Sequence, residues 1–205
     1  MRFFLTGIIL IFSVTHSLCQ SVITASTDST VNVSDFEYIL DSTKSLGEKD
    51  VFAKAEANQL QKYSADAFVP GYHVYWIHFY VENKGNFDEE WVMDFQNWSY
   101  VTAYLKDSTH ISEQKTGHLY PYNKRDYKVA NKAYILLKLK AGERKNYVVR
   151  LESKYNNELV PAALGFKIIK KEIADKQDVL TGKVIYSFLS IFLVMFIYNL
   201  FISFS

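Results

Sequence analysis

The chain has 205 residues, with 23 Lys and Arg against 22 Asp and Glu, and a net charge of +1. This balance gives no electrostatic reason for binding nucleic acid or a strongly acidic partner. Fifteen Tyr and fifteen Phe are present, and aromatic residues favour half-buried pleated surfaces. The single cysteine, Cys19, lies near the N-terminus, which excludes a disulfide or a thiolate metal site in the rest of the chain.

Residues 1–19 have the pattern of a secretory signal peptide. Arg2 supplies the positive start, Phe3–Val14 forms a short apolar stretch, and the small residues Ser17 and Cys19 suit cleavage before Gln20. Two alternatives stay open, namely a lipoprotein signal with Cys19 acylated and an uncleaved anchor. All three predict that the middle of the chain is exported.

The C-terminal residues 184–205 are predicted to form a transmembrane helix. No charge occurs between Val184 and Phe204, and about 21 residues at ~1.5 Å each cross a ~30 Å hydrocarbon core. A buried core helix is the alternative. The preceding lysines favour a cytoplasmic flank by the positive-inside rule, but long domains are translocated largely regardless of charge. We therefore expect the preceding domain on the outer side.

The first half of the chain predicts a lead-in over residues 20–30, a short strand at Thr30–Val33, and short helical patterns in Asp35–Leu46 and Val51–Tyr63. Tyr72–Asn83 is the strongest strand pattern. Both of its faces are apolar or aromatic, which predicts a central strand covered on both sides.

Further strands are predicted in the second half of the chain. They are Trp91–Gln96, Tyr100–Lys106, one near Gln114–His118, Ala133–Lys140, Asn146–Glu152 and Ala163–Ile169. We expect Ala133–Lys140 and Asn146–Glu152 to pair as a hairpin. Short strands at this spacing predict an all-β sandwich over residues 31–171, followed by a polar linker over residues 172–183.

No motif for catalysis, a cofactor or a metal is present. The sequence lacks a phosphate loop, a zinc-protease motif and a nucleophile elbow. His73 and His78 point to opposite faces of one predicted strand and cannot share a metal. Asp88–Glu90 is more typical of a solvated face than of a catalytic pair. We therefore predict that the protein is not an enzyme, with an exported glycoside-active enzyme as the weaker alternative.

Aromatic residues supply the predicted ligand site. Trp91, Trp98, Tyr100 and Tyr104 are expected along one hairpin beside a loop rich in tyrosine, where exposed rings can stack on sugars. Packing in the core or at its rim is the alternative for the strand residues. The predicted ligand-binding residues are Trp98, Tyr100, Tyr120, Tyr122, Arg125, Tyr127 and Arg150.

The order of these features resembles the type 2 extracellular domain of bacterial seven-transmembrane receptors with diverse intracellular signalling modules. The resemblance covers roughly Val31–Ser205. It rests on Trp76 in WIHFYVEN, on YVVRLES at Tyr147–Ser153, on the sandwich leading into the membrane, and on IYNLFISFS at Ile197–Ser205. Arg150 is retained, whereas His78 stands where the family usually has Arg.

The resemblance implies a jelly-roll-like sandwich followed by the first helix of a seven-helix bundle. It further implies a receptor domain that binds a carbohydrate or another small polar ligand and relays binding to the membrane helices. A cytoplasmic output domain would lie outside this chain, which is then expected to be part of a longer receptor. The alternative is a membrane-anchored carbohydrate-binding module that does not signal.

Overall fold

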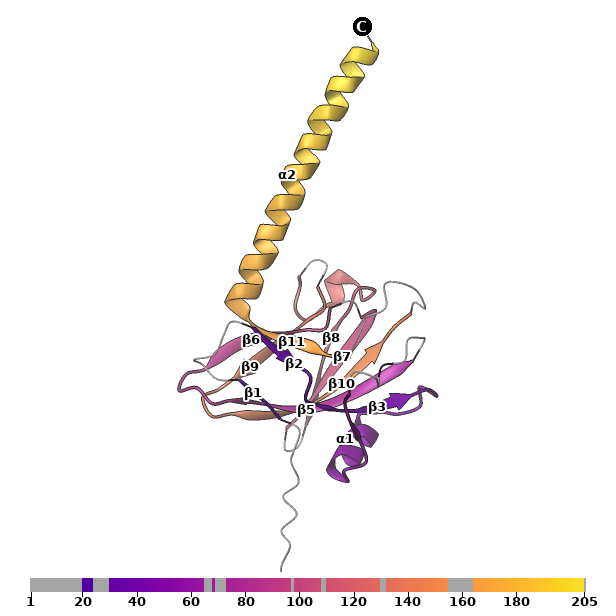
Figure 1. Ribbon diagram of the computed structural model, residues 1–205, viewed down its shortest axis with the longest axis vertical. Helices are drawn as coiled ribbons and strands as arrows, with labels where there is room; N and C mark the ends of the chain where they lie inside the picture. The colour runs from indigo at the N-terminus through magenta and orange to yellow at the C-terminus, as the bar shows by residue number, and fades with distance from the viewer. Residues whose placement is uncertain are drawn as a thin grey trace, which may run out of the picture.

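The computed structural model describes residues 20–23 (backbone), 30–64, 68, 73–96, 98–107, 110–129, 132–154 and 164–204. The predicted signal peptide lies outside these residues. Within them, two β-sheets stack as a sandwich from which one long helix projects (Figure 1). The all-β sandwich expected from the sequence is confirmed.

The larger sheet has the strand order β4-β3-β5-β10-β7-β8, with β1 added in parallel beside the end of β5. Its strands are β1 (Gln20–Ile23), β3 (Glu37–Asp41), β4 (Gln61–Lys62), β5 (Val74–Asn83), β7 (Tyr100–Lys106), β8 (Ile111–Thr116) and β10 (Arg144–Glu152). The smaller sheet has the order β2-β11-β6-β9. Its strands are β2 (Thr30–Val33), β6 (Glu89–Asp94), β9 (Tyr134–Leu139) and β11 (Phe166–Lys170).

Strand β5 is central and covered on both faces, as predicted. Its residues Tyr75, Ile77 and Phe79 point into the core between the sheets. On the opposite face, Val74 and Trp76 pack under α1 (Glu48–Glu56). This alternation follows from the period of two along a strand.

Helix α1 occupies part of the second helical pattern and covers the outer face of the larger sheet. The Asp50 carboxylate accepts the Gly47 N–H at 3.0 Å, which satisfies a free donor at the helix start. Val51, Phe52 and Ala55 are the buried residues of the helix. Its apolar side is thereby turned toward the sheet.

Two predictions of local structure are wrong. The helical pattern in Asp35–Leu46 contains strand β3, because Tyr38 and Ile39 pair with β5 and pack on opposite faces of the sheet. The predicted hairpin of Ala133–Lys140 with Asn146–Glu152 does not form. Strand β9 pairs with β6, whereas β10 lies between β5 and β7, so the turn at Gly142 carries the chain from one sheet to the other.

Helix α2 (Lys171–Ser203) follows β11 directly and extends away from the sandwich (Figure 1). The residues expected as a linker, 172–183, are part of this helix. Ala174 is buried against Val92, Tyr134 and Ile169 of the smaller sheet. Beyond these first turns the helix is exposed, and it is long and apolar enough to cross a membrane.

Candidate functional site

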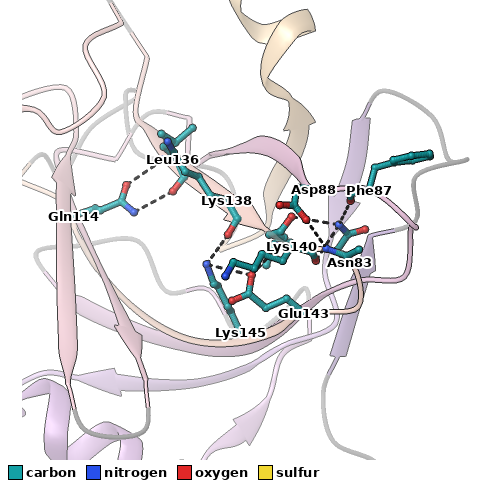
Figure 2. Close-up of polar contacts among 11 residues, drawn as sticks. Asn83, Phe87, Asp88, Gln114, Leu136, Lys138, Lys140, Glu143 and Lys145 are labelled. Atoms are coloured by element: carbon teal, nitrogen blue, oxygen red, sulfur yellow. Dashed lines mark hydrogen bonds and ion pairs between the residues drawn. The ribbon is translucent and has the colours of Figure 1, made fainter.

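A surface groove lies where the β5–β6 connection meets the turn between β9 and β10 (Figure 2). Its volume is about 340 Å³. The lining residues are Asp88, Glu89, Glu90, Lys138, Leu139, Lys140, Glu143 and Lys145. None of them is aromatic and seven are charged, so the groove suits polar ligands.

Asn83 holds the two walls of the groove together. Its buried side-chain amide donates to the carbonyl oxygens of Phe87 at 2.8 Å, Lys140 at 3.1 Å and Leu139 at 3.3 Å (Figure 2). Its side-chain oxygen accepts the Gly85 N–H at 2.9 Å. One residue at the end of β5 thereby fixes the connections at both sides of the groove.

The charges of the groove are largely paired with one another. Lys138 lies 3.0 Å from Glu90, and Lys145 lies 3.6 Å from Glu143. Lys145 also donates to the carbonyl of Lys138 at the free edge of β9 (Figure 2). The paired groups present acceptors and donors side by side with little excess charge. This arrangement suits a neutral ligand with several hydroxyl groups.

The groove reaches the start of α2 through Glu89. This carboxylate lies 3.4 Å from the ammonium group of Lys170, the last residue of β11. The same ammonium group lies 5.3 Å from the ring centre of Trp91, within cation–π range. An ion pair therefore connects a residue in the wall of the groove to the residue that precedes α2.

Gln114 connects the edge strands of the two sheets. Its amide nitrogen donates to the Leu136 carbonyl at 3.0 Å, and its amide oxygen accepts the Leu136 N–H at 3.2 Å (Figure 2). The Gln114 side chain, from β8, thus forms the hydrogen bonds that a neighbouring strand would form along β9. This contact covers part of an edge that would otherwise be free to pair with another chain.

Four of the predicted site residues, Tyr120, Tyr122, Arg125 and Tyr127, lie in the segment between β8 and β9, residues 117–133, here called the β8–β9 loop. Arg125 is buried and donates to the carbonyls of Tyr120 at 3.2 Å, Val129 at 2.9 Å and Lys132 at 3.2 Å. Burial lowers the pKa of this guanidinium group. Arg125 therefore holds the loop together. Tyr122, in the short helix η2 (Tyr122–Lys124), is 53% exposed.

Tyr127, also predicted as a site residue, attaches the same loop to α2. Its hydroxyl donates to the carboxylate of Asp175, and Lys171 lies 2.8 Å from the other oxygen of that carboxylate. Its ring stacks on Tyr134, and burial and the hydrogen bond to Asp175 raise its pKa. The loop and the base of α2 are consequently one packed unit.

The remaining predicted residues lie elsewhere. Trp98 is 1% exposed and packs in the core against Tyr75, so no ring face is open to a sugar. The expected hairpin of Trp91, Trp98, Tyr100 and Tyr104 does not exist, because β6 and β7 belong to different sheets. Tyr100 and Arg150 lie on the outer face of the larger sheet, with Lys154 over the Tyr100 ring and Glu152 2.9 Å from Arg150.

Histidine and carboxylate side chains do not form a metal centre in the described part of the chain. His78 is buried between Glu37 at 3.0 Å and Asn146 at 2.9 Å. Sequence reasoning missed the groove because its walls come from three separate strands. The available signals were the acidic run Asp88–Glu90 and the basic pattern around the Gly142 turn.

Comparison with known proteins adds one finding to this geometry. A family model described as 7TMR-DISM extracellular 2 matches residues 34–164, which is more than half of the chain. No curated protein matches the chain. The matched region runs from the loop before β3 to a position two residues before β11 and so includes most of the sandwich. The chain therefore belongs to the 7TMR-DISM extracellular 2 family, the extracellular sensor domains of 7TMR-DISM receptors.

Proposed function

We propose that this chain senses a carbohydrate or another small polar ligand outside the cell membrane and relays binding to the membrane helices of its receptor. In this proposal residues 1–19 direct export, the sandwich acts in the manner of jelly-roll carbohydrate-binding modules, and residues 184–205 cross the membrane as the first helix of a bundle. The remaining helices and the output domain would belong to the longer receptor.

The observation that carries the proposal is the position of Glu89. It lines the groove and also pairs with Lys170, which immediately precedes α2. A ligand hydroxyl that binds the Glu89 carboxylate competes with Lys170 for it. Binding then shifts the population of arrangements at the base of α2, which is how a sensor acts without catalysis.

The pairing of charges in the groove favours an uncharged ligand with many hydroxyl groups. Glu90 and Glu143 can accept from hydroxyl groups, while Lys138 and Lys145 can donate to them. The aromatic residues predicted from the sequence remain a second proposal for ligand contacts. Of these, Tyr100, Tyr120 and Tyr122 are at least partly exposed.

Binding is tested by titrating the full chain in lipid nanodiscs with a panel of neutral and acidic oligosaccharides in a calorimeter. A neutral sugar is expected to bind, and Lys138→Gln combined with Lys145→Gln is expected to weaken its affinity at least about tenfold. Lys106→Gln, which alters an ion pair with Glu56 of α1 outside the groove, is the matched control. Binding that is unchanged in the double variant would exclude the groove, and release of shorter sugars would indicate an enzyme.

The relay is tested by hydrogen exchange of residues 171–178 with and without the bound sugar. Bound ligand is expected to alter the rate of amide hydrogen exchange in these residues in the wild type. It should leave that rate unaltered in Glu89→Gln. Glu113→Gln, which loses the ion pair with Lys115, should behave like the wild type. A ligand that binds without any change at α2 would instead support the membrane-anchored binding module.

A further inference from the structure

The β8–β9 loop lies on the side of the sandwich from which α2 leaves. Figure 1 shows the short helix η2 projecting toward the same side as α2, whereas α1 lies on the opposite side. The hydrogen bond from Tyr127 to Asp175 fixes the loop beside the base of the helix. A membrane crossed by α2 would therefore face this loop.

The β8–β9 loop carries three exposed cations. Lys124, Lys128 and Lys132 are all exposed, and no ion pair joins any of them to a carboxylate in the part of the chain that the structure describes. The one carboxylate of the loop, Asp126, is exposed and accepts the backbone N–H of Lys115 at 2.7 Å. The loop therefore carries more positive than negative charge.

Many lysines elsewhere behave differently. Nine of them are paired with a carboxylate. This group includes three at the base of α2, namely Lys170, Lys171 and Lys176, so the helix base itself carries little free positive charge. The loop accordingly places exposed lysines beside a helix base whose own lysines are paired.

Tyr122 adds an aromatic group to this basic surface. Its ring is 53% exposed on η2, beside Lys124. Tyrosine is enriched at membrane–water interfaces because its ring is apolar and its hydroxyl group is polar. An exposed tyrosine among free lysines is thus suited to the headgroup layer of a membrane.

The spacing along α2 agrees with this position. Val184, where the charge-free stretch begins, lies nine positions after Asp175, which the loop contacts. At ~1.5 Å per position the distance along the helix is about 14 Å, of which a headgroup layer occupies about 5–8 Å. A loop that projects from the sandwich by the remaining interval would reach the headgroup layer.

We propose that the β8–β9 loop binds the anionic lipid headgroups of the membrane through Lys124, Lys128 and Lys132, with Tyr122 inserted at the interface. This inference rests on the proposed function in one respect, because it requires α2 to cross the membrane. Lipid contact orients the sandwich on the membrane, and the Tyr127–Asp175 bond passes that orientation to α2. Attraction of this kind weakens with added salt.

The test uses a single exposed tryptophan as a reporter. The native Trp76, Trp91 and Trp98 are each 1% exposed or less. In the full chain reconstituted in phosphatidylcholine vesicles that carry a headgroup nitroxide lipid, Tyr122→Trp therefore reports contact of the loop with headgroups. The matched control is Ala53→Trp on the exposed side of α1, away from the membrane.

We expect the Tyr122→Trp fluorescence to be quenched strongly when phosphatidylglycerol is included and to recover at high salt. Adding Lys124→Gln, Lys128→Gln and Lys132→Gln should reduce the quenching to that of Ala53→Trp, whereas Lys49→Gln, Lys54→Gln and Lys84→Gln should not. Equal quenching with and without phosphatidylglycerol, or quenching no greater than that of Ala53→Trp, would overturn the proposal. Circular dichroism verifies that each variant is folded.

Alkaline carbonate extraction of the same vesicles separates this proposal from the one on which it rests. A chain that stays in the membrane but shows no loop quenching disproves lipid contact alone. A chain that is extracted disproves the membrane crossing and the loop proposal with it.

Discussion

The groove and the β8–β9 loop are built in the same way but carry different charge. Each is held by one buried polar side chain that donates to three backbone carbonyls, Asn83 in the groove and Arg125 in the loop. Each also contacts the start of α2, through Glu89–Lys170 and Tyr127–Asp175 respectively. In the groove, Lys138 and Lys145 are paired, whereas no carboxylate among the described residues pairs with the exposed lysines of the loop.

This difference indicates two kinds of partner for one helix. Paired charges offer hydrogen bonds without a net field and suit a neutral, hydroxyl-rich ligand. Unpaired lysines create a positive field that suits an extended anionic surface. Both regions could bias α2, one in response to ligand and the other in response to the membrane. The following predictions test that comparison.

Trp98→Ala should have the largest effect on stability. The ring fills the core under the start of the loop, where the Trp98 carbonyl accepts the His118 N–H at 3.0 Å. Its removal should lower the free energy of unfolding by about 3–5 kcal/mol. Chemical denaturation in detergent measures this change. If Trp98 were a ligand platform instead, stability would be kept and only sugar binding would be lost.

Asn83→Ala should be the next most damaging change. It leaves three carbonyls without their donor at a fully buried position, which should cost about 3 kcal/mol. Amide hydrogen exchange should become faster in the β5–β6 connection and the β9–β10 turn, and it should change little in the β8–β9 loop. Asn123→Ala, at an exposed position in η2, is the control and should be neutral.

Arg125→Met should loosen the loop by a smaller amount. The long apolar side chain keeps much of the packing but cannot donate to the three carbonyls, and water can reach this site because Arg125 is 8% exposed. We expect a loss of about 2 kcal/mol with faster exchange confined to the loop. Lys124→Met, the exposed neighbour, should leave stability unchanged. Faster exchange in the groove as well would contradict the independence of the two regions.

Tyr127→Phe removes the hydroxyl group that joins the loop to α2. The ring can still stack on Tyr134, so the cost should be limited to about 1 kcal/mol. Exchange of residues 171–178 should become faster. Tyr122→Phe is the matched control, since its hydroxyl lies 3.5 Å from the Lys128 carbonyl and does not contact α2. An equal effect of both variants on α2 would exclude Tyr127 as the connection.

Acidification should produce the smallest effect. Burial tends to raise the pKa of Asp175, but hydrogen bonds from Lys171 and Tyr127 outweigh it and leave the pKa below 3.8. The stabilisation that the charged Asp175 carboxylate provides is therefore present above the ordinary aspartate pKa. It is lost as the pH falls through the pKa that Asp175 has in the folded protein. The stability difference between the wild type and Asp175→Asn should shrink between about pH 6 and about pH 3. A stability difference that stays constant over this pH range would show that the charge of the Asp175 carboxylate does not contribute to stability.

The sequence predicted individual strands well where side-chain alternation was strong. Strand β5 is central because both faces of Tyr75–Phe79 are apolar, and that property is visible in the residues themselves. The segment Asp35–Leu46 was misassigned because pairing of β3 with β5 outweighs a weak helical pattern. The site was harder to predict. An aromatic ring in a sequence does not reveal whether it faces a ligand, as Tyr122 shows by its exposure and Trp98 by its burial.

The sequence alone determined three features, because each depends on residues close together along the chain. They are the apolar run at the C-terminus, the central strand and the motifs that carry the family resemblance. Only the tertiary structure decided three others. They are the pairing of β9 with β6 rather than β10, the groove, and the attachment of the loop to α2. The physical reason is sequence separation. Glu89 and Lys170 are 81 residues apart, and Tyr127 and Asp175 are 48 apart, so only the stacking of two sheets brings these charges and hydroxyl groups to one helix.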